Sequence, residues 1–438
     1  MKRRSIFDEI ALKDVISFVV DNRGKTVPVE DSGIPLIATA NISNSELYPS
    51  VDTDRYVSEE IYSNWFRSHP QVDDVILTNK GSKNGEVCLV PYPVEFCIAQ
   101  DMVALRANKK IIYPKYLLAS LRSSLVQKRI KLLNVDAVIP HFKKSDFDKL
   151  FIPLPSLDVQ EFIGQIYFDI SLRIELNRKN NETLEGIAKA IFKSWFIDFD
   201  PVRAKSEGRS TGLPDEISKS FSDSFEDSEL GEIPYGWKSG ILGDYVSIKR
   251  GGSPRPIKDF MVEEGLPWVK ISDATASDNR FIPFTKGFIR PEGLSKTVFL
   301  KRGSLILSNS ATPGIPKFLD LDACIHDGWL YFPEKTIFSD LYLYELFLWI
   351  RPSLCLLGNG SVFTNLKTDI LKNFEVLIPN NDCLKLFDKI LDPLHQKCLL
   401  LMRHSQSLCE IRDTLLPKLI SGELKVPDAE KMLEEVGI

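Results

Sequence analysis

The sequence predicts an α+β protein in which two mixed α/β domains are separated by two long antiparallel coiled-coil helices and are related by an internal pseudo-twofold repeat. Three observations predict this fold: two long amphipathic stretches of matching pattern, short landmarks that recur in order, and strand-like runs before each stretch. With 43% hydrophobic and 26% charged residues, the composition is that of an ordinary globular protein. A chain of 438 residues has room for roughly two to four domains.

The first amphipathic stretch covers residues 158–201. Its apolar residues recur three and four positions apart at each end, which is typical of one face of an α-helix. These residues are Ile163, Ile166, Ile170, Leu184, Ile187 and Ile191. A helix of about 35 residues rises roughly 50 Å. One small domain cannot cover that length, so the helix needs a partner of similar length.

The second stretch, residues 382–422, superposes on the first with a constant offset, since 382 − 158 = 224. The six apolar positions then fall on Phe387, Ile390, Leu394, Leu408, Ile411 and Leu415. Two unrelated helices, each belonging to its own domain, are the alternative, but an ungapped match of this length favours a duplication. We therefore expect the two helices to pack against each other through these twelve residues, in antiparallel orientation.

The globular segments repeat as well. Residues 75–79, Val-Ile-Leu-Thr-Asn, return as residues 305–309, Leu-Ile-Leu-Ser-Asn. The offset drifts across the globular part and is constant across the helix, which is typical of loops that vary beside a helix of fixed length. The predicted divisions are a first domain at 1–155, a central helix at 156–200, a linker rich in Ser, Glu, Gly and Pro at 201–234, a second domain at 235–379, a C-terminal helix at 380–423 and a C-terminal tail at 424–438.

Charge and cysteine content bound the location and partners of the protein. The net charge is −5 and the pI about 5.8, which argues against a surface coated by nucleic acid but leaves local basic faces open. Seven cysteines without regular spacing fit a reducing compartment. The longest apolar run, residues 341–350, contains Glu345 and is too short to span a bilayer. We expect a cytoplasmic protein without a membrane segment.

Three phrases carry a resemblance to a known family. Residues 192–202 read FKSWFIDFDPV after the first helix, residues 231–237 read GEIPYGW at the start of the second domain, and residues 415–422 read LLPKLISG at the end of the second helix. In this order they resemble the specificity subunit of Type I restriction-modification enzymes over nearly the whole chain. One departure lies at the helix starts, where Gln160 and Glu161 stand opposite Leu384 and Lys385.

The resemblance implies a function without catalysis. Each domain would be a target recognition domain for one half of an asymmetric bipartite site in double-stranded DNA, and the chain would direct adenine methylation and restriction by its partners. Those partners would be two modification (methyltransferase) subunits, held by the spacer helices, and restriction (translocase/endonuclease) subunits. S-adenosylmethionine, ATP and Mg would belong to the partners, with no cofactor in this chain. The alternative is a non-enzymatic coiled-coil scaffold with two protein-binding domains.

Motifs for other chemistry are incomplete. Gly24-Lys25-Thr26 is similar to the end of a phosphate-binding loop, but Val19 stands where that loop needs its first glycine. His395 and Cys409, with Cys398 and His404 between them, lie 14 residues apart, about 21 Å along a helix, so they cannot converge on one metal ion. No methyltransferase or nuclease motif is present in the sequence. We expect neither a metal site nor an active site.

DNA contacts are expected from loops of the two domains. Lysine and serine suit phosphates, and asparagine can pair with adenine edges, although a plain surface turn is the alternative for each loop. The candidates in the first domain are Arg23, Lys25, Asn79, Lys80, Ser82, Lys83, Asn84 and Lys143. The candidates in the second domain are Arg250, Ser253, Arg255, Lys270, Asn309, Ser310, Thr312 and Lys367.

Overall fold

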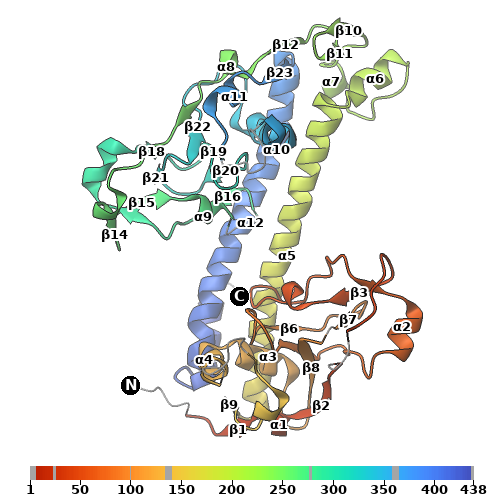
Figure 1. Ribbon diagram of the computed structural model, residues 1–438, viewed down its shortest axis with the longest axis vertical. Helices are drawn as coiled ribbons and strands as arrows, with labels where there is room; N and C mark the ends of the chain where they lie inside the picture. Colours follow the sequence, from red (N-terminus) through yellow and green to blue (C-terminus); the bar gives the residue numbers. More distant parts are fainter. Residues whose placement is uncertain are drawn as a thin grey trace. The chain divides into compact units, whose positions relative to one another are not determined.

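The computed structural model describes residues 6–22, 26–98, 100–133, 141–275, 279–357 and 365–435 (Figure 1). It confirms the mixed helix and sheet class. The chain divides into two compact units, one formed by Met1–Arg178 with Arg403–Ile438 and the other by Lys179–Met402. No helix in the described part of the chain is long and apolar enough to cross a membrane.

The two long helices are α5 (Leu157–Phe196) and α12 (Asn381–Ser421). About half of each helix belongs to unit 1 and the other half to unit 2. In unit 1, Ile163 and Ile170 of α5 pack with Leu415 and Leu419 of α12. In unit 2, the ring of Phe192 from the end of α5 lies 6.0 Å from that of Phe387 near the start of α12. The helices are therefore antiparallel within each unit, as predicted.

Most of the twelve residues predicted at the helix interface are buried or partly buried, but Ile187 is 43% exposed. The buried position next to it is Ala188. The interface continues in one heptad phase from Leu184 through Ala188, because the next position of that phase lies four residues on. The prediction for Ile187 was wrong because it considered only large apolar side chains, whereas the residue that is buried at this position is the small Ala188.

The same heptad phase passes through polar residues in the middle of α5. Asn177 and Asn181 are both buried. The Asn177 side-chain nitrogen lies 3.1 Å from the Ser405 hydroxyl and 3.2 Å from His404 Nδ1 on α12. The contact of Asn177 with Ser405 and His404 favours one register of the two helices, because a shift of one helix along the other would leave a buried polar group without its partner.

In unit 1, two sheets and a short strand pair form the globular part. The sheets have the strand orders β2-β8-β5-β6 and β4-β3-β7, and β1 pairs with β9. The strands are β1 (Glu9–Ala11), β2 (Ile16–Val20), β3 (Ile34–Ile37), β4 (Tyr56–Val57), β5 (Val75–Thr78), β6 (Val87–Leu89), β7 (Cys97–Ile98), β8 (Met102–Ala107) and β9 (Phe151–Pro153). The helices are α1 (Leu12–Val15), η1 (Thr39–Asn41), α2 (Glu59–Asn64), α3 (Pro114–Arg122), α4 (Ser124–Leu132), η2 (Lys144–Asp146) and α13 (Val426–Glu435).

In unit 2, the two main sheets have the orders β13-β22-β19-β20-β16 and β14-β17-β15-β21-β18. Pairs β12-β23 and β10-β11 complete the strands. The strands are β10 (Phe225–Ser228), β11 (Gly231–Pro234), β12 (Lys238–Ile241), β13 (Lys249–Arg250), β14 (Met261–Val262), β15 (Leu266–Val269), β16 (Phe281–Ile282), β17 (Phe288–Ile289), β18 (Val298–Leu300), β19 (Leu305–Ser308), β20 (Pro316–Leu319), β21 (Ala323–Ile325), β22 (Trp329–Tyr331) and β23 (Glu375–Ile378). The helices are α6 (Asp200–Ser206), α7 (Asp215–Ser218), α8 (Leu242–Tyr245), η3 (Ile257–Asp259), α9 (Ile271–Thr275), η4 (Pro291–Lys296), α10 (Asp340–Leu357) and α11 (Thr368–Lys372).

The repeat extends to strand pairing. In unit 1, β3 runs parallel to β7, with Ile37 opposite Ile98; in unit 2, β15 runs parallel to β21, with Val269 opposite Ile325. Strand β5 lies antiparallel to β8, as β19 does to β22. The recurring sequence landmarks therefore occupy equivalent places in two sheets of the same design.

Two segments that were predicted as a linker and a C-terminal tail contain regular secondary structure. Residues 201–234, expected as a linker, contain most of α6, helix α7 and the β10-β11 hairpin, and bury Val202 and Phe221 against the aromatic end of α5. The tail contains α13, which buries Ala429 and Leu433 in the core of unit 1. Both segments are polar overall, and the few apolar side chains that they bury form too short a pattern to predict their helices and strands from the sequence.

A buried charged cluster lies in unit 2, where β16, α10 and α5 meet. The Arg280 side chain is 3% exposed, and its Nη2 lies 3.2 Å from Glu345 Oε1, which is 2% exposed. Its Nε lies 3.4 Å from Glu185 Oε1, and its guanidinium carbon lies 4.5 Å from the centre of the Tyr344 ring. A buried charge of this kind depends on its partners, because removal of one leaves the other unpaired in the core.

We predict opposite effects for two glycine-to-alanine changes in α5. A Cβ at Gly164 would lie 2.6 Å from the backbone nitrogen of Tyr116 in α3, whereas a Cβ at Gly186 meets nothing within 4 Å. Gly164→Ala should therefore destabilise the protein by roughly 1–3 kcal/mol, and Gly186→Ala should stabilise it by up to about 1 kcal/mol through helix propensity. Thermal unfolding of the two variants checks this; equal shifts would contradict the close approach of α3.

We predict an acid-sensitive contribution from His395 in α12. Its ring centre lies 5.0 Å from that of Phe281 and 4.6 Å from that of Phe318. Burial, assisted by Arg280 and opposed by Asp392, lowers the pKa of His395 to about 4. The unfolded chain, with a pKa of about 6.5, takes up the proton first, so this contribution is complete above pH 6.5 and is lost as the pH falls toward 4.

Denaturant unfolding of wild type and His395→Phe between pH 7.5 and 4.5 measures this contribution. Relative to the variant, the wild type should lose about 2.5 kcal/mol at pH 4.5. The comparison is made as a difference because burial also raises the pKa of Glu345 to about 7, which acts in the opposite direction. A difference that does not change with pH would show that folding does not lower the pKa of His395.

Candidate nucleic-acid interface

Loops at equivalent strand ends hold most of the predicted site residues. The backbone N–H of Asn79 donates to Asp101 O (3.1 Å), and the Asn79 carbonyl accepts from Phe142 N–H (2.9 Å). In unit 2 the N–H of Asn309 donates to Gly328 O (2.8 Å), and its carbonyl accepts from Leu366 N–H (2.6 Å). The same two bonds therefore fix the start of both loops.

The side chains of these two asparagines do not face solvent. Asn79 is 1% exposed and Asn309 is 3% exposed. The Asn79 amide has no hydrogen-bond partner among the described residues, while Asn309 Nδ2 lies 3.4 Å from Asp327 O. Buried amides cannot reach a base edge in this structure, so the prediction of Asn79 and Asn309 as DNA contacts is corrected: it is their backbone hydrogen bonds that anchor the loops.

In unit 1, the loop after β5 divides into anchoring and outward residues. Lys83 Nζ donates to Ala40 O (3.1 Å) and Ile42 O (2.9 Å), and Asn84 Oδ1 accepts from Phe142 N–H (3.4 Å). Lys80 and Ser82 are exposed, with Lys80 Nζ 3.7 Å from Asp101 Oδ1. Lys80 and Ser82 are therefore the exposed predicted contacts of this loop, whereas Lys83 and Asn84 are partly buried and hydrogen-bonded within the unit.

The equivalent loop in unit 2 turns tightly. Thr312 N–H donates to Ser310 O (2.6 Å), and the Ser308 hydroxyl donates to Thr312 O (2.6 Å). Ser310 and Thr312 are partly exposed. Farther along the chain, Lys143 in unit 1 and Lys367 in unit 2 are exposed at equivalent positions. Arg23 and Lys25 lie outside the described residues.

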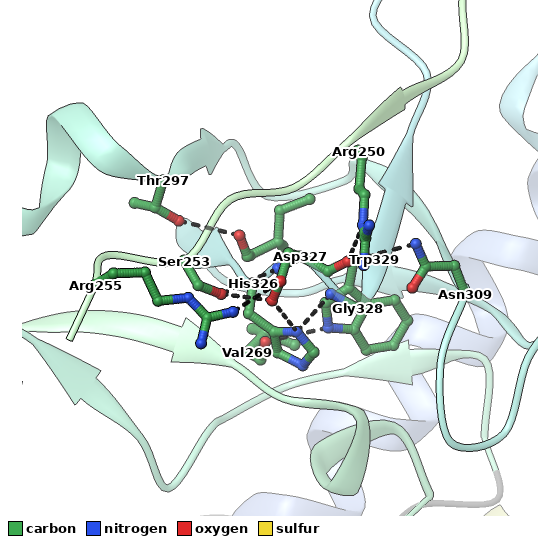
Figure 2. Close-up of polar contacts among 11 residues, drawn as sticks. Arg250, Ser253, Arg255, Val269, Thr297, Asn309, His326, Asp327, Gly328 and Trp329 are labelled. Carbon is green, nitrogen blue, oxygen red and sulfur yellow. Dashed lines mark hydrogen bonds and ion pairs between the residues drawn. The ribbon is translucent and has the colours of Figure 1, made fainter. Parts of the chain in front are cut away.

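Three further candidates in unit 2, Arg250, Ser253 and Arg255, contact one residue that sequence reasoning missed, Asp327 (Figure 2). The Ser253 hydroxyl donates to Asp327 Oδ1 (2.6 Å), and Arg255 Nη2 lies 3.2 Å from Asp327 Oδ2. Arg250 Nε donates to the Asp327 backbone carbonyl. Partial burial alone raises the pKa of Asp327, but the Ser253 bond and the two arginines lower it below its usual value, which favours the charged carboxylate.

Hydrogen bonds tie the residues around this cluster to neighbouring strands. The Trp329 indole N–H donates to Val269 O (3.1 Å), and the Thr297 hydroxyl donates to Ile325 O (3.0 Å), as Figure 2 shows. His326 Nδ1 accepts from Gly328 N–H (2.6 Å), and burial lowers the pKa of His326, which favours the neutral ring. Lys270, the remaining candidate, lies with its Nζ 5.9 Å from the Trp268 ring centre.

Unit 1 has a cavity of about 190 Å³ at the corresponding strand ends. It is lined by Thr26, Val27, Ala38, Thr39, Arg55, Gln100 and Asp101. Among these, Arg55 and Gln100 were also missed, because they lie 45 residues apart in the sequence and only the fold brings them to one cavity. Each unit thus carries a polar surface on the same framework, with different side chains.

The described residues include no group of three or more His, Cys, Asp and Glu side chains that could hold a metal ion. What the fold assembles is a pair of polar surfaces rich in arginine, lysine, serine and amide groups. Such groups bind phosphates and base edges. The fold and the site thus define a repeated two-domain protein with two unlike polar binding surfaces.

Comparisons with known proteins show what this chain is similar to. Residues 7–186 match the model of the Type I restriction modification DNA specificity domain. The Type I restriction enzyme HindI specificity subunit of Haemophilus influenzae is 24% identical over 410 residues, covering 80% of this chain and 86% of the relative. The MjaIX specificity subunit of Methanocaldococcus jannaschii is 26% identical over 348 residues, covering 76% and 75%.

A crystal structure of the S subunit of a Type I restriction-modification system from M. genitalium shares the fold, with a TM-score of 0.58, 16% identity, and coverage of 95% of this chain and 96% of that one. The chain is thus similar to Type I restriction-modification specificity subunits over most of its length, and its residues 7–186 match their DNA specificity domain.

Two lysines of the loop after β5 should separate anchoring from DNA contact. Lys83→Met removes two hydrogen bonds of a charged donor and should lower stability by roughly 1.5–3 kcal/mol. Lys80→Met removes an exposed ion pair and should leave thermal unfolding nearly unchanged, but should lower the slope of log affinity for DNA against log salt by about 1. Calorimetry and salt-dependent DNA binding check the pair; a change of slope for neither variant would remove this loop from the interface.

Proposed function

We propose that this chain reads an asymmetric bipartite site in double-stranded DNA and thereby directs adenine methylation and restriction by partner subunits. The supporting observation is the repeat itself: one framework of strands and loops occurs twice in a single chain with unlike polar side chains. A homodimer presents identical readers and suits a palindromic site, whereas two unlike readers on one chain suit an asymmetric one.

The proposed division of labour follows the repeat. The first target recognition domain, residues 1–155, would read one half-site through the loop with Lys80 and Ser82 and the cavity near Arg55. The second, residues 235–379, would read the other half-site through the surface around Asp327. The exposed lysines, Lys143 and Lys367, would contact phosphates, which adds affinity without sequence preference.

The proposed partners are two modification (methyltransferase) subunits and restriction (translocase/endonuclease) subunits. The paired helices support the number two, because the constant offset of 224 between the two stretches repeats the same heptad positions on both helices. Matching surfaces at two places would accept two copies of one partner. We assign S-adenosylmethionine, ATP and Mg to those partners and none of them to this chain. The free cysteines, Cys88 and Cys97 among them, support a cytoplasmic location.

Domain exchange tests this proposal. Replacement of residues 1–155 by the matching segment of a relative with another specificity should change one half of the methylated site and leave the other half and their separation unchanged. The control is the reciprocal exchange of residues 235–379, which should change only the other half. Sequencing of methylated DNA after coexpression with the modification subunits gives the result. Absence of sequence-specific methylation in the complex with unaltered chain would favour a protein-binding scaffold instead.

A further inference from the structure

We infer that Gln100 in unit 1 and Asp327 in unit 2 are the specificity-determining residues at one equivalent position of the two domains. This inference rests on the proposed function and names the side chains that read bases. Gln100 follows β7 and Asp327 follows β21, each two residues after the isoleucine that pairs with the neighbouring parallel strand. The spacing is equal, since 327 − 100 = 227 and 325 − 98 = 227.

The backbone fixes both positions in the same way. The residue after Gln100 is Asp101, whose carbonyl accepts from Asn79 N–H (3.1 Å); the residue after Asp327 is Gly328, whose carbonyl accepts from Asn309 N–H (2.8 Å). Each position is thus held between the end of a buried strand and an anchored loop. A side chain at this position changes its chemistry without a change of framework, which is what two different readers require.

The surroundings of Gln100 suit an adenine. It lines the cavity of about 190 Å³ with Arg55, Thr26 and Thr39. Among the described residues, neither the Gln100 amide nor the Arg55 guanidinium has a hydrogen-bond partner. A glutamine amide can donate to adenine N7 and accept from its N6 amino group. We therefore assign Gln100 to an A·T pair in the half-site of unit 1.

The surroundings of Asp327 suit a C·G pair. Its side chain is 39% exposed although Ser253 and Arg255 hold the two carboxylate oxygens. A carboxylate accepts from cytosine N4, and a nearby arginine can donate to O6 and N7 of the paired guanine. Asp327 and Arg255 together therefore offer groups complementary to both bases of one pair. The exposed Asp327–Arg255 ion pair itself adds little to folding stability.

The test is sequence preference measured on DNA with randomised half-sites, with the full chain in complex with its modification subunits. Asp327→Asn should shift one position of the half-site read by unit 2 from cytosine toward adenine, with a roughly 5- to 150-fold loss at the original base, and leave the other half-site unchanged. Gln100→Ala should relax one position of the half-site read by unit 1 by a similar factor. The matched control is Asp322→Asn, an exposed aspartate at the other end of β21 that pairs with Lys301; it should change no base preference.

The outcomes are separable. If the complex with Asp327→Asn methylates the original site with unchanged preference, or if it loses affinity equally for all sequences, Asp327 does not read a base. The inference is then wrong, while the proposed function stands. If Asp327→Asn does not fold, Gln100→Ala decides, because no hydrogen bond of its side chain is seen among the described residues; unchanged preference there overturns the inference. If the complex with unaltered chain shows no sequence preference, the proposed function itself fails.

Discussion

The heptad interface of α5 and α12 is the constraint on which both units depend. Each unit is built on one half of each helix, and its core includes residues of that half. The unit boundary falls between Arg178 and Lys179 in α5 and between Met402 and Arg403 in α12, and 403 − 179 = 224, the offset of the repeat. A change of register would therefore disturb the core of both units at once, which explains why the helix length is the same in the two halves while loop lengths drift.

In each unit a second helix contacts a long helix at an equivalent position, but the chemistry of that contact differs between the units. In unit 1, Gly164 lets the backbone of α3 approach α5 closely. The corresponding position in α12 is 164 + 224 = 388, and there Asp388 accepts a hydrogen bond from the Ser339 hydroxyl next to the start of α10. A close steric contact in one unit is thus replaced by a polar contact in the other. The repeat conserves where a helix meets the long helix, and the means of contact differ.

The polar surfaces follow the same rule. Asn79 and Asn309 are buried anchors in equivalent backbone positions, and the side chains nearby differ between the units. Unit 1 has a cavity with Arg55 and Gln100, whereas unit 2 has arginines drawn to Asp327. A constant framework with variable side chains is what a family of specificity subunits needs, because a new DNA sequence can be read without a new fold.

The sequence alone determined the long helices, their antiparallel pairing, the duplication and the loops that border the polar surfaces, because heptad spacing and recurring landmarks are local or periodic signals. Only the tertiary structure decided which loop residues face outward. Lys83 is drawn to carbonyls about 40 residues away, and Asp327 gathers groups more than 70 residues away. It also showed that Ala188, and not Ile187, fills the helix interface. Burial and long-range hydrogen bonds depend on packing between distant segments, and no pattern within one segment carries that information.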